Sequence, residues 1–156
     1  MGSSNAQEEF ERLFEASKQS LIGQAYLLTG DLQDAQDLVQ EAFLRAWRAW
    51  GRVGSLDDPP AWVRHVLYNL AFSHLRRRRI RRRRDSITVP TFVPAADAGH
   101  LDILAALGGL PPNQRRAIVL AAVVGLSISE IASELGTGEG TVRVWLSRAR
   151  ATIAAS

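Results

Sequence analysis

Cysteine is absent from the 156 residues of the sequence, which excludes disulfide bonds and thiolate metal sites. A reducing compartment suits such a chain. No apolar run approaches the about 20 residues that a helix needs to cross a bilayer. The amino terminus, MGSSNAQEEFERLFE, is polar and acidic and does not resemble a secretory signal. We therefore expect a soluble, cytoplasmic protein with no membrane insertion.

The groups that catalysis requires are also missing. The sequence shows no nucleophile beside a general base, no glycine loop that cradles a phosphate and no cluster of metal ligands. His65 and His74 are nine residues apart, and no acidic ligand lies at a matching spacing. We therefore expect a protein that is not an enzyme and that needs no metal or cofactor.

Charge is unevenly distributed along the chain. The formal net charge of +3 comes from 19 basic and 16 acidic residues, and eight of the arginines lie in residues 76–84, RRRRIRRRR. Without this block, 11 basic residues face 16 acidic ones, a balance of −5. A uniformly basic coat, typical of proteins that package nucleic acid without specificity, is therefore excluded.

Apolar residues that recur at intervals of three, four and seven predict helices in the first half of the chain. The first of these helices runs from about residue 6 to residue 28. Asp31 is positioned to cap a second helix, and Pro59-Pro60 opens a third helix that runs into the arginine block. Residues 51–58, between the second and third helices, are expected to form a loop.

The middle of the chain interrupts this helical pattern. Residues 85–99, DSITVPTFVPAADAG, contain two prolines and no sustained helical period, so they predict a flexible linker. A short helix is expected over residues 102–107, and another from Pro111-Pro112 to about Val124. No segment predicts a strand. We expect an all-α protein with two small helical domains.

A helix–turn–helix motif follows in the second domain. Ser127 and Glu130 have the spacing of a capping box, and Gly136 lies where a helix end favours positive φ. Thr137 is the expected cap of the next helix, which starts near Glu139. In that helix Val142, Leu146 and Ala149 are expected to face inward, with Arg143, Arg148 and Arg150 outward.

Two interpretations of this motif are open from the residues alone. Helix–turn–helix proteins place their second helix in the DNA major groove, where outward arginines reach phosphates or base edges. A helical hairpin whose arginines only maintain solubility has the same pattern, because short helix pairs with glycine turns are common.

Three segments resemble, in the correct order, the extracytoplasmic-function (ECF) sigma factors of the sigma-70 family. DLQDAQDLVQEAFLRAWRAW (31–50) resembles the region that binds core RNA polymerase, and PAWVRHVLYNLAFSHLRRRR (60–79) the region that engages the −10 element. LPPNQRRAIVLAAVVGLSISEIASELGTGEGTVRVWLSRAR (110–150) resembles the domain that reads the −35 element.

The resemblance implies a division into residues 6–84 for polymerase and −10 binding, residues 85–99 as linker, and residues 100–156 for −35 binding. It implies a sigma factor that binds core RNA polymerase and directs promoter-specific transcription initiation, on duplex −35 and melted −10 DNA. It also implies an anti-sigma partner. We expect weak promoter binding by the chain alone and specific recognition only on the polymerase.

The resemblance further assigns site residues. A polar stripe on the second helix is usually a solvated face, but the resemblance assigns it to polymerase binding. The candidates are Asp34, Asp37, Leu38, Gln40, Glu41 and Arg45. Candidates for −10 DNA belong to the third helix: Trp62, Arg64, Asn69, His74, Arg76, Arg77, Arg78 and Arg79. Residues 51–58 correspond to the loop that holds a flipped −10 base. Trp62 is also consistent with a role in the core, which a tryptophan near a helix start has more often than a role in stacking.

Candidates for −35 DNA are Arg115, Glu139, Thr141, Arg143, Arg148 and Arg150. Two positions after Arg143 depart from the family pattern, in which a small residue and then an arginine are usual. Val144 and Trp145 occupy them, so a basic −35 contact is missing, and Trp145 is available to pack against a helix or a partner. Ser73 replaces an aspartate found in many relatives.

Two other functional classes are consistent with parts of this pattern. A stand-alone helix–turn–helix regulator would need a dimer interface and a palindromic operator, and it leaves the acidic second helix without a role. A sigma-like interaction protein would bind polymerase or an anti-sigma partner without promoter activity. Charge reversal at Asp37 or Glu41 discriminates, because it disrupts polymerase binding in every class except the regulator.

Overall fold

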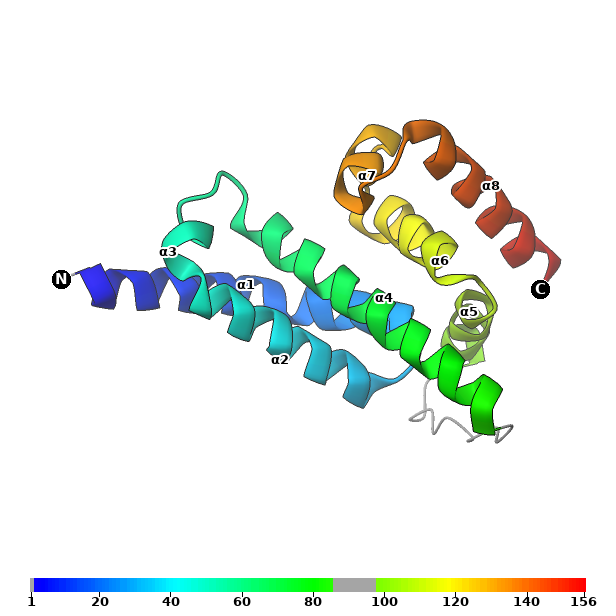
Figure 1. Ribbon diagram of the computed structural model, residues 1–156, viewed down its shortest axis with the longest axis horizontal. Coiled ribbons are helices and arrows are strands. Elements are labelled where there is room, and N and C mark those ends of the chain that lie inside the picture. The colour runs from blue at the N-terminus through cyan, green and yellow to red at the C-terminus, as the bar shows by residue number, and fades with distance from the viewer. Residues whose placement is uncertain (1, 86–97) are drawn as a thin grey trace.

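A computed structural model describes residues 2–85 and 98–156 of the chain, with side chains for residues 2–81 and 102–156. The described residues form helices and turns, and no strand occurs among them, as the sequence predicts (Figure 1). Their elements are α1 (Gly2–Thr29), α2 (Leu32–Arg48), α3 (Trp50–Val53), α4 (Pro59–Asp85), α5 (Ala98–Gly108), α6 (Pro112–Val119), η1 (Leu120–Val124), α7 (Ile128–Leu135) and α8 (Glu139–Ala155).

Helices α1, α2 and α4 pack side by side and form the first domain (Figure 1). A tight turn reverses the chain between α1 and α2. The Thr29 hydroxyl donates to the Ala25 carbonyl at 2.9 Å, Gly30 has φ of +73°, and the Asp31 carboxylate accepts from the Asp34 amide at 2.9 Å. Glycine tolerates this φ, and Asp31 satisfies an amide that the first turn of α2 leaves free. The predicted cap is confirmed.

The expected loop at residues 51–58 is wrong for its first part, because residues Trp50–Val53 form the short helix α3. Trp50 and Val53 are both buried, and the Trp50 ring lies 5.4 Å from the Phe10 ring. Burial of these side chains draws the segment into a helical turn. A side chain at Gly54 would place its Cβ 2.9 Å from the Trp50 ring, so glycine is required where the turn leaves α3.

Helices α5 to α8 form the second domain. The expected helix from Pro112 to Val124 is present, but its last turn, η1, is π-helical and ends at Gly125 with φ of +83°. The Ser127–Glu130 capping box is confirmed, as is positive φ at Gly136. The predicted cap Thr137 is wrong, since Gly138 caps α8. The Thr137 amide instead donates to the Ala132 carbonyl and closes the turn after α7.

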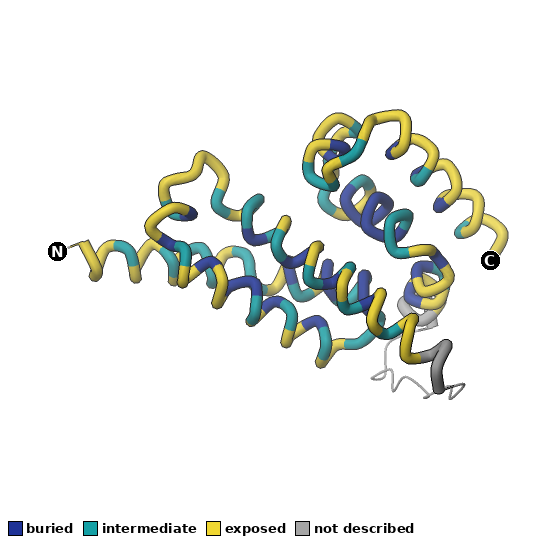
Figure 2. Tube along the Cα trace, viewed as in Figure 1, coloured by how far each residue is buried: buried dark blue, intermediate teal, exposed yellow. Residues whose placement is uncertain are grey.

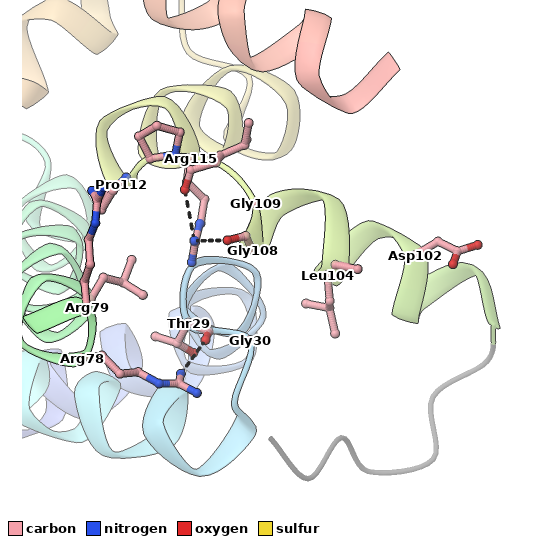
Figure 3. A pocket seen from close by; sticks show the side chains of 14 residues that line it. Thr29, Gly30, Arg78, Arg79, Asp102, Leu104, Gly108, Gly109, Pro112 and Arg115 are labelled. Carbon is pink, nitrogen blue, oxygen red and sulfur yellow. Dashed lines mark hydrogen bonds between the residues drawn. The ribbon is translucent and has the colours of Figure 1, made fainter. Parts of the chain in front are cut away.

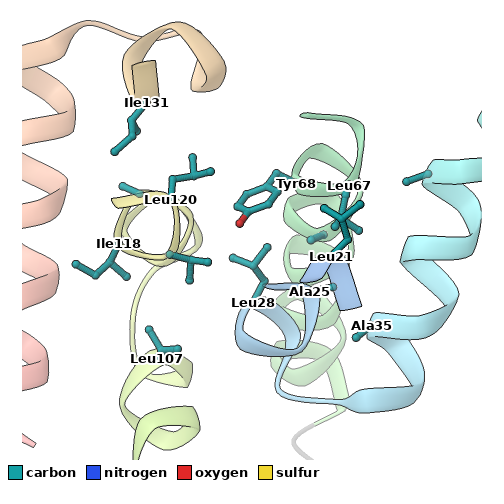
Figure 4. Packing of buried hydrophobic residues seen from close by; sticks show 14 of the residues in the cluster. Leu21, Ala25, Leu28, Ala35, Leu67, Tyr68, Leu107, Ile118, Leu120 and Ile131 are labelled. Atoms are coloured by element: carbon teal, nitrogen blue, oxygen red, sulfur yellow. The ribbon is translucent and has the colours of Figure 1, made fainter. Parts of the chain in front are cut away.

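The two domains share one continuous buried cluster. Leu28 of α1 and Tyr68 of α4 face Leu120, the first residue of η1 (Figure 4), and Figure 2 shows buried residues on the facing sides of α4 and α6. The predicted linker, residues 85–99, lies mostly outside the described residues, which resume at Ala98. The sequence predicts two domains, and the structure adds that they pack directly against one another.

Candidate nucleic-acid interface

The polar stripe on α2 lies at the protein surface. Asp37, Gln40 and Arg45 are exposed, whereas Leu38 and Glu41 are half-buried. The Arg45 Nε atom donates to Glu41 Oε1 at 3.1 Å. This arrangement leaves a charged face along most of the helix that no described element covers.

Sequence reasoning missed two apolar residues on the same face. Leu44 and Trp47 are 42% and 44% exposed and follow Gln40 by one and two helical turns. Leucine and tryptophan on a solvated helix face would have indicated this patch, because such a face normally carries polar residues. The α2 face therefore combines charge with exposed apolar area, a composition typical of protein interfaces.

Asp34 behaves differently from the rest of the stripe. Its carboxylate Oδ2 lies 3.0 Å from the His74 Nε2 atom and 4.0 Å from the Arg78 Nη1 atom. Arg78 also donates to the Thr29 carbonyl at 3.2 Å (Figure 3). Asp34, predicted to bind polymerase, thus joins the start of α2 to His74 and Arg78 in the second half of α4. Both of these residues are predicted to bind −10 DNA.

The predicted −10 residues on α4 divide into covered and exposed groups. Asn69, Arg76, Arg77 and Arg79 are exposed. Trp62 is half-buried and packs against the core, which favours the core role weighed for it. Arg64 is turned toward the second domain. The exposed arginines leave a cationic edge near the end of the described side chains.

Arg64 forms an ion pair with Glu134 of α7. Its Nε and Nη2 atoms donate to the same Glu134 Oε1 atom at 3.0 and 2.8 Å, and the two side chains are 17% and 10% exposed. One turn along α4, the Tyr68 hydroxyl donates to the Gln24 Oε1 atom at 2.7 Å. Burial, and then the Glu134 charge, raise the pKa of Tyr68 well above its ordinary value, so it remains a neutral donor.

Arg115 lies inside the protein, although the resemblance assigns it to −35 DNA. It is 8% exposed, and its guanidinium donates to the carbonyls of Leu28, Gly108 and Leu110 at 2.5, 3.0 and 3.2 Å. Figure 3 shows this side chain between the end of α1 and the turn before α6. Arg115 therefore fastens the two domains together in this arrangement.

A second arginine supports the same junction. The Arg116 Cζ atom lies 4.0 Å from the centre of the Phe72 ring of α4, and its Nη2 atom donates to Asn113 Oδ1 at 2.8 Å. Burial lowers the pKa of Arg116. Beside the junction, a cavity of about 770 Å³ is lined by residues of both domains, among them Arg78, Arg79 and Arg115.

The outward face of α8 is open. Arg143 is exposed and lies 3.4 Å from the Glu139 carboxylate, and Thr141, Arg148 and Arg150 are exposed as well. Val142, Leu146 and Ala149 are buried, as predicted from their spacing. Trp145 is half-buried and packs against the core. The second helix of the motif therefore presents arginines to solvent.

The family model described as Sigma-70 region 2 matches residues 13–81, and Sigma-70, region 4, matches residues 100–153. The ECF RNA polymerase sigma factor SigM of Mycobacterium tuberculosis is 31% identical over 93% of this chain and 75% of its own length. The chain belongs to the ECF sigma factor family. SigJ of the same species is 35% identical over 91% of this chain and 49% of its own length.

SigE of Mycolicibacterium smegmatis is another similar sigma factor, 37% identical over 81% of this chain and 52% of its own length. This ECF chain thus spans about half the length of SigJ and SigE. Among solved structures, the sigma factor RpoE of Bartonella quintana, bound to the anti-sigma factor NepR, gives a TM-score of 0.72 with 26% identity. The match covers 94% of each chain.

A second solved relative is CnrH in complex with the cytosolic domain of CnrY, with a TM-score of 0.70 and 29% identity over 96% of this chain and 87% of that one. The described part of this ECF sigma factor contains no group of three or more histidine, cysteine or acidic residues placed to hold a metal. None of its described helices is both long and apolar enough for a bilayer.

Proposed function

We propose that this chain binds core RNA polymerase and directs promoter-specific transcription initiation. The matches to Sigma-70 regions 2 and 4, in that order, carry the proposal. The chain supplies recognition, and phosphodiester chemistry belongs to the polymerase. Because every partner of this chain would be an intracellular one, the proposed location is the cytoplasm.

The division of labour follows the predicted regions. Residues 6–84 bind polymerase and the −10 element, residues 85–99 join the domains, and residues 100–156 read the −35 element. Polymerase docks on the α2 face through Asp37, Leu38, Gln40, Glu41 and Arg45, with Asp34 at its margin and Leu44 and Trp47 as apolar anchors. Their exposed apolar area supports this addition.

Melted −10 DNA is first bound along α4 by Arg76, Arg77 and Arg79. Arg64, Asn69, His74 and Arg78 then join these contacts, whereas Trp62, predicted for −10 DNA, supports the helix from the core. Exposure supports this order, since the first group is open and most of the second is half-buried. A cationic track with nearby aromatic surface suits single-stranded DNA. In the −35 domain, Glu139 and Thr141 face base edges, and Arg143, Arg148 and Arg150 hold phosphates.

Binding of −10 DNA by Arg64 requires the domains to separate. In the closed arrangement the Arg64 guanidinium is hydrogen-bonded to Glu134, so it is not available to a DNA phosphate. Arg115 joins the −35 contacts only if its three bonds to backbone carbonyls break. The free chain therefore binds promoter DNA weakly, and docking on polymerase opens it.

An anti-sigma partner is part of the proposal. Two solved relatives with TM-scores of 0.72 and 0.70 are sigma factors in complex with an anti-sigma factor and with the cytosolic domain of CnrY, respectively. Both matches cover nearly all of this chain, so the same two-domain arrangement is available here to such a partner.

The test is co-purification with core RNA polymerase, followed by run-off transcription on a library of promoter fragments. We expect a stoichiometric complex and transcripts from a small set of fragments that share −10 and −35 elements. Polymerase binding without transcripts would instead support a sigma-like interaction protein. Absence of polymerase binding would contradict the proposal and favour a stand-alone regulator.

A further inference from the structure

The outward face of α8 carries one large aliphatic side chain that the core does not use. Val144 is 45% exposed, whereas Val142 and Leu146 on either side are buried. Trp145, the other unusual residue of this segment, packs against the core. Of the two residues of this segment that depart from the family pattern, Trp145 thus belongs to the core and Val144 is exposed to solvent.

The surroundings of Val144 are those of a DNA-reading surface. Thr141 lies one turn earlier on the same face and is exposed, so two methyl-bearing side chains are neighbours. Arg143 and Arg148, which flank them, are exposed and complementary in charge to phosphates. An isolated aliphatic residue among arginines is too small for a protein interface, which buries about 800 Å² on each partner.

One base offers a methyl group in the major groove. Thymine carries a C5-methyl there, whereas the other three bases present hydrogen-bond donors and acceptors and no methyl group. Contact between this methyl and an aliphatic side chain removes apolar surface from water on both partners, which is favourable. A hydrogen-bonding residue at the same position would leave the methyl without a matching partner.

We propose that Val144, with Thr141 beside it, selects a thymine in the −35 element through the C5-methyl group. This inference rests on the proposed function, because it takes α8 as the helix that enters the major groove. It makes Val144 a determinant of specificity at one base pair. The flanking arginines supply affinity that is independent of sequence.

The test uses holoenzyme and the promoter selected by run-off transcription. Each thymine of the −35 element, on either strand, is replaced in turn by deoxyuridine, which lacks only the C5-methyl. At one position we expect affinity to fall about threefold to fivefold, the loss typical of one buried methyl group. Val144→Ala should weaken binding to the thymine promoter by a similar factor and be insensitive to deoxyuridine at that position.

Val123→Ala is the matched control. Val123 is also an exposed valine of the second domain, 53% exposed, but it belongs to η1 rather than to α8. This variant should retain both the affinity and the deoxyuridine sensitivity of the unaltered protein. Because Val144 and Val123 are both exposed, neither substitution should impair folding.

Three results would overturn the assignment of Val144: a −35 element without thymine on either strand, no deoxyuridine effect at any position, or an effect that persists in Val144→Ala. A variant that loses transcription equally on both templates would indicate that Val144 contacts another group, such as the polymerase. Failure to form holoenzyme is detected earlier, and it would overturn the proposed function together with this inference.

Discussion

Glu134 receives both hydrogen bonds from Arg64 on a single oxygen atom. The Arg64 Nε and Nη2 atoms lie 3.0 and 2.8 Å from Oε1, and the second Glu134 oxygen, Oε2, is buried with no hydrogen-bond partner. A pair with one unsatisfied buried oxygen is weaker than a bidentate one. The ion pair holds the two domains together. A DNA phosphate, which offers more acceptor atoms, can replace Glu134 as the partner of Arg64.

Glu134→Gln should therefore release Arg64 for DNA. We expect the free chain to bind single-stranded −10 DNA about threefold to tenfold more tightly, because the neutral amide retains one acceptor but loses the charge. Fluorescence anisotropy at fixed salt measures this change. Glu8→Gln, at an exposed acid of α1, is the charge-matched control.

The same experiment separates the ion pair from a general charge effect. If Arg64 is the group released, Arg64→Gln combined with Glu134→Gln should bind no more tightly than Arg64→Gln alone. Equal affinity of Glu134→Gln and the unaltered chain would contradict the closed state as a barrier to −10 binding.

Asp37→Arg should weaken polymerase binding. Asp37 is exposed at the centre of the α2 face. Its replacement by arginine places a positive charge against a polymerase surface that is complementary to an acidic side chain. We expect affinity for core polymerase to fall about tenfold or more, equivalent to about 1.4 kcal/mol. Surface plasmon resonance on immobilised polymerase provides the measurement. Glu8→Arg makes the same charge change outside this face, and an equal loss there would argue against α2 as the docking site.

Arg115 and Arg143 provide a matched pair of buried and exposed arginines. Arg115→Gln should lower the free energy of unfolding by about 2 kcal/mol or more, because it removes charged donors from three carbonyls, of which those of Leu28 and Leu110 are buried. Arg143→Gln should leave stability unchanged but reduce the slope of log affinity against log salt by about 0.9 on holoenzyme, the loss of one phosphate contact.

Urea unfolding and salt titration of promoter binding report the two quantities separately. The assignment of Arg115 to the domain junction would fail if its replacement changed the salt slope and left the urea midpoint unaltered. In that case the arginine would serve DNA, as the family resemblance implied.

Ser127→Ala should destabilise the helix–turn–helix by about 1 kcal/mol, the usual contribution of an N-cap side chain. The effect should depend on pH. Hydrogen bonds from the Ser127 backbone and side chain lower the pKa of Glu130 from its ordinary 4.5. The stability contributed by this carboxylate is therefore fully present above pH 4.5 and is lost as pH falls through the lower folded-state pKa.

Thermal unfolding at several pH values tests this dependence. The difference between Ser127→Ala and the unaltered chain should shrink in acid. Ser129→Ala, at an exposed serine of the same helix, should show neither the loss nor the pH dependence. A difference that stays constant into acid would indicate that the Ser127 hydroxyl does not contribute to the lowered pKa of Glu130, since the backbone amide of residue 127 donates to Glu130 in both proteins.

Local features were predictable because their causes lie within a few residues. The Asp31 cap, the Ser127–Glu130 capping box and the positive φ of Gly136 each depend on hydrogen bonds or sterics inside one turn. The Thr137 cap was wrong by one residue, because its amide is used by the preceding helix. The α3 helix was missed because it depends on burial of Trp50 against Phe10, 40 positions away in sequence.

What the sequence determined by itself is every long helix, the order of the two domains and the family, since apolar period, caps and motifs are written in neighbouring residues. Only the tertiary structure decided which arginines are exposed to solvent. Arg115 and Arg143 look alike in sequence, yet one donates to a carbonyl of a distant helix and the other faces solvent. That difference, like the 70-residue span from Arg64 to Glu134, arises from how the domains pack.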